Sequence, residues 1–74
     1  MMTKFKVYRI VRGQKPHVIG TYNTFELAAA FVRKRYFLVA DRLTKIADGY
    51  WVLVFDCGNS IRIKEVNESE EQKK

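Results

Sequence analysis

The sequence has one cysteine and one histidine in 74 residues, and this scarcity excludes several kinds of chemistry. The single cysteine, Cys57, cannot form a disulfide within the chain. Cys57 and His17 are also too few and too far apart in sequence for a Cys/His metal site or a catalytic set. We therefore expect ordinary surface positions for both residues. We expect no metal, no cofactor, no small-molecule substrate and no enzymatic activity.

Glycine and long apolar runs are also scarce. The four glycines stand alone in the sequence, so no glycine-rich phosphate loop is present. The longest apolar stretches, residues 36–40 and 50–55, are far too short to span a bilayer. Lys4 and Lys6 stand where a signal peptide would need an apolar run. Together with the lone cysteine, these features predict a cytoplasmic protein that does not enter a membrane.

Positive charge is what the sequence has in excess. Fourteen lysines and arginines against eight acidic residues give a net charge of +6. Residues 1–45 carry +8 of this charge, and residues 46–74 carry −2. A field of this sign favours polyanions or acidic protein surfaces as partners, without choosing between them.

The N-terminal part has the pattern of a β-hairpin. Residues 4–12 alternate apolar and polar side chains, apart from Arg9 and Ile10, which stand on the unexpected faces. After a turn, residues 17–22 form the second strand. Gly20 in this strand marks a bulge or a close contact.

The C-terminal part predicts a second hairpin. Asp48-Gly49 is a turn signal, and residues 50–55 are aromatic and β-branched throughout. Because this run lacks polar alternation, we expect a central strand that is buried on both faces. Residues 60–66 form the return strand after a tight turn.

Between the hairpins, the sequence predicts a helix. Asn23 is a good N-cap, with Glu26 completing a capping-box pattern, and residues 33–35 place positive charge at the helix end. The apolar side chains span roughly 200° of the helix, against roughly 100° for a helix on one layer. Either another chain covers the second side, or the helix ends near Tyr36 and the following residues fold back into the core. We favour the second arrangement.

Residues 37–47 have two interpretations. One long helix could continue to Ala47, because apolar residues recur at spacings of three and four. Alternatively, the helix breaks near Ala40-Asp41, and residues 43–46 form a short extra strand. The sequence thus predicts an α+β domain over residues 3–66, in which an antiparallel sheet of two hairpins carries one principal helix in the order ββαββ. Residues 67–74 form a polar tail that we expect to be disordered.

The favoured function is a non-catalytic binding module that acts through an acidic protein partner or as a homodimer. Leu27, Phe31 and Leu38 share one helix direction and would anchor such an interface, with Lys34 and Arg35 at its rim. The alternative is that these side chains close the domain's own core.

Nucleic-acid binding is the second function that the sequence allows. If the polar faces of the first and last strands coincide, cations surround Tyr8, which can stack on an unpaired base. The opposing interpretation is that a solvated sheet face must be polar, and that lysines on edge strands discourage aggregation. The candidate residues for nucleic-acid binding are Lys4, Lys6, Tyr8, Arg12, Arg33, Lys34, Arg35, Arg62 and Lys64.

Overall fold

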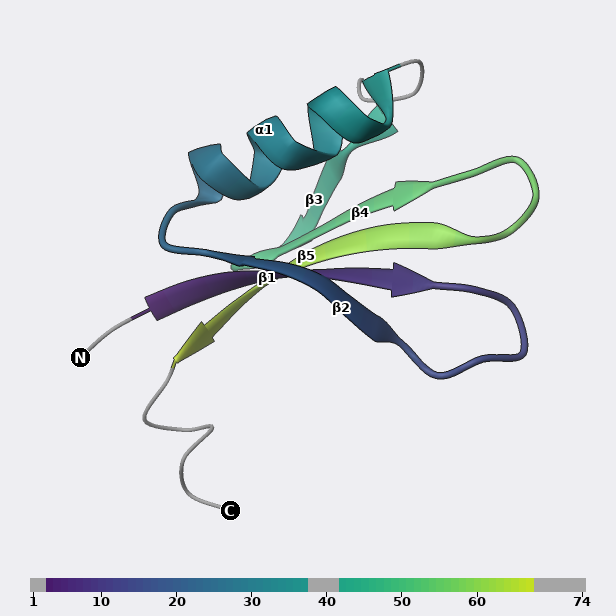
Figure 1. Cartoon of the computed structure of the whole chain (residues 1–74), viewed down its shortest axis with the longest axis horizontal. Helices are drawn as coiled ribbons and strands as arrows, with labels where there is room; N and C mark the ends of the chain where they lie inside the picture. The colour runs from purple at the N-terminus through teal and green to yellow at the C-terminus, as the bar shows by residue number, and fades with distance from the viewer. Residues whose placement is uncertain (1–2, 38–41, 68–74) are drawn as a thin grey trace.

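The computed structural model describes residues 3–37 and 42–67, which form one sheet and one helix. The strands form a five-stranded antiparallel sheet in the order β2-β1-β5-β4-β3, and α1 lies over one face of it (Figure 1). This confirms the α+β fold with a hairpin on either side of one helix. The elements are β1 (Thr3–Ile10), β2 (His17–Tyr22), α1 (Phe25–Arg35), β3 (Thr44–Ala47), β4 (Tyr50–Val54) and β5 (Ser60–Asn67).

The core lies between α1 and the middle of the sheet. Val7 of β1, Leu53 of β4, and Ile61 and Ile63 of β5 are fully buried. They are neighbours across the strands, because Val7 opposes Ile63 and Leu53 opposes Ile61. The helix presents short side chains to them, and its buried residues are Ala28, Ala29 and Val32. These small residues allow the helix backbone to approach the sheet closely.

Aromatic rings at both ends of α1 pack against rings in β4 or directly after it. At its start, Phe25 stacks on Trp51 with ring centroids 4.2 Å apart, and Phe5 contacts both rings. At its end, Tyr36 lies 5.3 Å from Phe55. Such ring pairs contribute about 0.5–1.5 kcal/mol each beyond the area that they bury.

The helix begins one residue later than the sequence predicts. Thr24 is the N-cap, and its hydroxyl accepts a hydrogen bond from the Leu27 amide at 3.2 Å. Asn23 instead accepts a bond from the Lys4 ammonium at 2.6 Å, so the prediction that Asn23 caps the helix is wrong. Both residue types cap well, and the contact that decides between them comes from β1.

The helix ends near Tyr36, as the favoured interpretation of the sequence predicts. Its last residue is Arg35, and the Tyr36 amide closes it by donating to the Val32 carbonyl at 2.8 Å. One long helix to Ala47 is therefore wrong, and β3 is the short extra strand. Phe37 does not fold back into the core, because its side chain is 72% exposed.

The position of β4 differs from the prediction of a central strand that is buried on both faces. The middle strand is β5, and β4 lies between β5 and the edge strand β3. Trp51 and Leu53 pack toward α1, whereas Tyr50, Val52 and Val54 lie on the opposite face, where Val54 is 53% exposed. The apolar run therefore reflects apolar residues on an uncovered face, not a second covering layer.

Gly20 marks both a bulge and a close contact, as its sequence position predicts. Val7 opposes Gly20 while Tyr8 opposes Val18, so Ile19 is the extra residue of β2. A Cβ atom at Gly20 would lie 2.7 Å from the Tyr22 ring, which excludes a larger residue without rearrangement. At the other end of the chain, Asn67 belongs to β5 instead of the predicted tail. Residues 68–74 lie outside the described residues.

Two leucines give a matched test of this core. Leu53→Ala should lower the free energy of unfolding by about 2–5 kcal/mol, because it leaves a cavity in a fully buried site. Leu27→Ala should change it by less than about 0.5 kcal/mol, because Leu27 is 52% exposed and alanine favours helix. Urea denaturation followed by circular dichroism measures both values. Equal losses for the two variants would contradict the assignment of the core.

Candidate functional site

The sheet face opposite α1, here called the open face, gathers most of the predicted nucleic-acid-binding residues. No helix or strand of the described residues covers it (Figure 1). Side chains alternate along a strand, and directly opposed residues share a face, so the register of the strands defines its members. In the three inner strands they are Lys4, Lys6, Tyr8 and Ile10 of β1, Ser60, Arg62, Lys64 and Val66 of β5, and Tyr50, Val52 and Val54 of β4. The outer strands add Val18 and Thr21 of β2 and Thr44 and Ala47 of β3.

The sequence left open whether the polar faces of the first and last strands lie on the same side of the sheet. In the structure they do. β1 and β5 are paired neighbours, with Lys6 opposite Lys64 and Tyr8 opposite Arg62. Like charges that oppose each other directly cost stability in a sheet. The open face therefore concentrates positive charge in the centre of the sheet, where it does not serve to protect an edge strand.

Acidic side chains are missing from the described strands on this face. Glu65 is the only acidic residue within those strands, and it opposes Phe5 on the helix side. Asp48 and Asp56 lie in turns, where they pair with Lys45 at 3.4 Å and with Arg42 at 2.9 Å. The cations of the open face therefore add to one field without local neutralisation from the strands.

Arg62 is held in place by a tyrosine. Its Nη1 donates a hydrogen bond to the Tyr50 hydroxyl, and its guanidinium carbon lies 5.8 Å from the centre of the Tyr50 ring. Its Nε is buried without a hydrogen-bond partner, and within the described ranges no carboxylate forms an ion pair with it. Because a guanidinium has five N–H donors, Arg62 is oriented while most of its hydrogen-bonding capacity stays unused.

The open face is hollowed around Arg62. A shallow groove of about 210 Å³ has aromatic, apolar and cationic walls. Its lining residues are Tyr8, Ile10, Pro16, Tyr50, Arg62 and Lys64. Sequence reasoning missed Tyr50, because residues 50–55 were expected to be buried on both faces. The signal that could have found it is the hairpin register, which sets Tyr50 opposite Lys64.

Arg12 lies beyond the end of β1, where the two long hairpins meet. Its backbone amide donates to the Asn59 side chain at 3.1 Å. Its Cδ lies only 3.1 Å from where a Cβ of Gly58 would be, so the side chain runs against that turn. Arg12 thus stands at one end of the open face, while Lys4 stands near the other.

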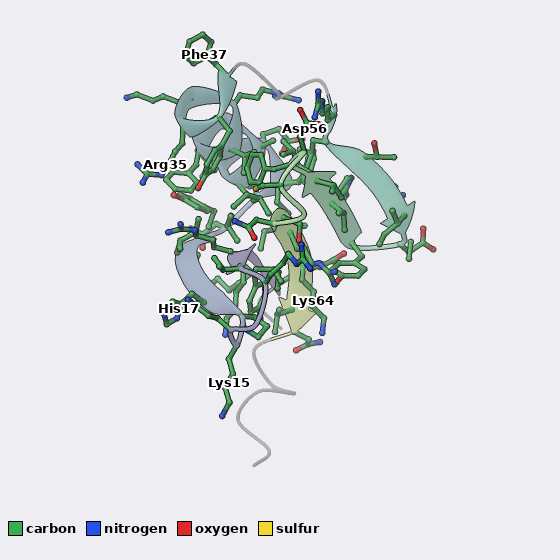
Figure 2. The ribbon with its side chains drawn as sticks, turned by 90° about the vertical axis from the view of Figure 1, so that its right-hand side faces the viewer. Lys15, His17, Arg35, Phe37, Asp56 and Lys64 are labelled. Carbon is green, nitrogen blue, oxygen red and sulfur yellow. The ribbon has the colours of Figure 1, made fainter. Side chains whose placement is uncertain are left out.

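The basic cluster of residues 33–35 does not join the open face. Arg33, Lys34 and Arg35 form the last turn of α1, on the other side of the sheet. Arg35 and Lys64 lie well apart in Figure 2. The nine candidate residues therefore belong to two separate surfaces. In the last turn, positive charge also stabilises the helix by opposing its dipole.

The predicted protein interface is only partly assembled. Leu27 is half exposed, but Phe31 is partly buried and packs on Tyr22 with ring centroids 5.7 Å apart. Leu38 lies outside the described residues. Two adjoining hollows, here called the helix groove, share Phe31 and Arg35. Their other lining residues are Lys34 in one, and Arg9, Ile19 and Tyr36 in the other.

The remaining surface offers no further chemistry in the described residues. Cys57 and His17 are exposed, as expected for surface positions. Within residues 3–37 and 42–67, no three metal-ligating side chains come together. The helix of this part of the chain is neither long nor apolar enough to cross a membrane.

Arg62→Met tests whether Arg62 is kept for stability. We expect the melting temperature to stay the same or rise, because methionine keeps the aliphatic part of the side chain. Removing an unpaired buried N–H and a repulsive charge should offset the lost hydrogen bond to Tyr50. Differential scanning calorimetry measures the change, with Arg42→Met as a control that removes only an exposed ion pair. A fall of more than about 4 °C would identify Arg62 as a structural residue.

Comparison with known proteins adds no functional assignment to this geometry. No protein-family model, no curated protein and no solved structure matches the chain. The open face and the helix groove are therefore the features on which a function has to rest.

Proposed function

We propose that the domain binds single-stranded nucleic acid across the open face of its sheet. One observation carries the proposal: two tyrosines stand among lysines and an arginine on an uncovered sheet face, and the described strands place no acidic side chain there. Such a surface matches both parts of an unpaired strand. Its cations suit the phosphates, and its aromatic rings suit the exposed bases.

The electrostatic part of this binding is sequence-independent. Lys4, Lys6, Arg62 and Lys64 form two adjacent rows along β1 and β5, so a backbone that follows the strands meets successive charges. Each contacted phosphate releases counterions, which makes the affinity depend on salt. The net charge of +6 also accelerates the encounter with a polyanion.

The aromatic part of the binding favours single strands over duplexes. Tyr8 and Tyr50 are partly exposed on the face, so their rings are accessible to bases that are not already paired. In a duplex, the bases are stacked on each other, and only the phosphates reach a broad sheet surface. The proposed role is binding without catalysis, in the reducing cytoplasm where the exposed thiol of Cys57 stays free.

Charge reversal on two surfaces tests the proposal. Lys6→Glu with Lys64→Glu should abolish binding of a labelled single-stranded oligonucleotide, measured by fluorescence anisotropy. Arg33→Glu with Lys34→Glu changes the net charge equally but lies on α1, so it should keep most of the affinity. For the unaltered protein, log affinity should fall with log salt. Lys6→Gln with Lys64→Gln, which removes two phosphate contacts without adding negative charge, should keep measurable binding and flatten that slope by about 1.4.

If the two double variants lose the same amount of affinity, binding depends only on the net charge of the protein, and the proposal is wrong. The proposal also fails if the unaltered protein binds duplex as tightly as single strands at near-physiological salt.

We propose docking of an acidic protein segment, or of a second copy of the chain, as the second candidate function. Its supporting observation is the helix groove, where Arg9 of β1 and Arg35 of α1 line one hollow together with Phe31. Leu27 supplies an exposed apolar contact on the same helix.

Leu27→Lys tests the self-association form of this second function. If the helix surface forms a dimer, the unaltered protein should sediment as a dimer and Leu27→Lys as a monomer with the same circular dichroism spectrum. A half-exposed site tolerates lysine, so folding should persist. A monomeric unaltered protein, or unfolding of the variant, would remove the support for this interface.

A further inference from the structure

We infer that the open face holds an unstacked strand of at least three nucleotides, with one base on Tyr8, another on Tyr50, and a phosphate between them on Arg62. The inference rests on the proposed nucleic-acid function and adds to it the form of the ligand. It also assigns separate roles to Tyr50 and Arg62. Two observations support it: the offset of the two tyrosines in the sheet, and the orientation of Arg62 between them.

The register of the sheet fixes the offset of the tyrosines. Tyr8 opposes Arg62 on one side of β5, and Tyr50 opposes Lys64 on its other side. The two tyrosines are therefore two strands apart across the sheet and two residues apart along it. With strands spaced by about 4.8 Å and residues by about 3.4 Å, their Cα atoms lie about 12 Å from each other.

The offset of the two Cα atoms is much larger than the separation of successive bases in a stacked strand, which is only about 3.4 Å. The two rings are therefore assigned to bases that do not stack on each other. A strand that uses both tyrosines must separate its bases, with at least one nucleotide between the two that stack. Only single-stranded nucleic acid can splay its bases like this.

Arg62 lies where it can bind the intervening phosphate. It stands between the tyrosines on β5, and the hydrogen bond from its Nη1 to the Tyr50 hydroxyl keeps the guanidinium over the sheet. Because Nε is buried, the donors left for a phosphate are those of the two terminal nitrogens, through which arginine can bind a phosphate in a bidentate manner. Lys64, in the same groove, adds a second cation.

The groove gives the Tyr8 position its walls. Ile10 and Pro16 line the same hollow as Tyr8 and Arg62, so a base on the Tyr8 ring would also contact apolar surface. None of these contacts depends on a particular base. The ligand class is therefore single-stranded nucleic acid with a spacing requirement, in which DNA and RNA share the bases and phosphates that the face recognises.

Trinucleotides with one abasic position test the spacing. Thymidine and uridine trinucleotides serve as DNA and RNA probes, and NMR titration measures their affinities. An abasic site in the middle should leave the affinity close to that of the intact trinucleotide. An abasic site at either end should cost about 5- to 150-fold, which is the contribution of one base stacked on an aromatic ring.

Protein variants identify which tyrosine meets which base. Tyr8→Leu and Tyr50→Leu should each weaken binding about 5- to 150-fold without changing the salt dependence. Each variant should lose its sensitivity to an abasic site at one end only. Phe37→Leu, which removes an exposed aromatic ring outside the open face, is the matched control and should bind like the unaltered protein. Unchanged melting temperatures show that the fold persists in each variant.

Two outcomes would overturn the inference: a middle abasic site that costs as much as a terminal one, or a Tyr50→Leu variant that binds with full affinity. If charge reversal of Lys6 and Lys64 abolishes binding while the tyrosine variants bind normally, the proposed function stands and this inference fails. If the unaltered protein binds neither longer oligonucleotides nor trinucleotides, both fail.

Discussion

The pairing of β1 with β5 joins the first and last described strands along eight residue pairs, from Thr3 with Asn67 to Ile10 with Ser60. The rest of the structure depends on this ladder. It places Val7 beside Ile63 under the helix, and the same alternation sends the neighbouring side chains to the other face. It also joins the two hairpins into one sheet, since β2 and β4 each reach the rest of the sheet only through β1 or β5. Because its partners are far apart in sequence, closing this ladder costs more loop entropy than closing either hairpin.

Local signals were enough to predict most of the elements. Period-two alternation located β1, Gly20 located the bulge of β2, and Asp48-Gly49 located the turn before β4. Local signals gave wrong predictions where a contact between residues far apart in sequence determines the structure. Asn23 and Thr24 are equivalent caps in sequence, and only the bond from Lys4 separates them. The order of strands is also a non-local property, so an apolar run such as Tyr50–Val54 was assigned to the centre, although it lies beside an edge strand.

The same limit applies to the candidate site. Alternation alone placed Lys4, Lys6 and Tyr8 together on one face, and the structure adds Arg62 and Lys64 through the pairing of β1 with β5. The contribution of Tyr50 depends on both the strand order and the absence of a second layer over the described strands, and no local pattern encodes either. The basic residues 33–35 were grouped with the sheet residues by charge, but the packing of Ala28, Ala29 and Val32 determines on which side of the sheet the helix carries them.

The core is filled entirely from one side of the sheet, and this has a consequence for how the domain can change over evolutionary time. Substitutions at Tyr50, Val52 or Val54 alter the open face without changing the packing of Leu53, Ile61 or Ile63. Residues of the core and residues of the open face thus alternate along the same strands. Because of this alternation, every second residue of these strands can vary while the core stays the same, which makes the open face a suitable region to randomise in a combinatorial library.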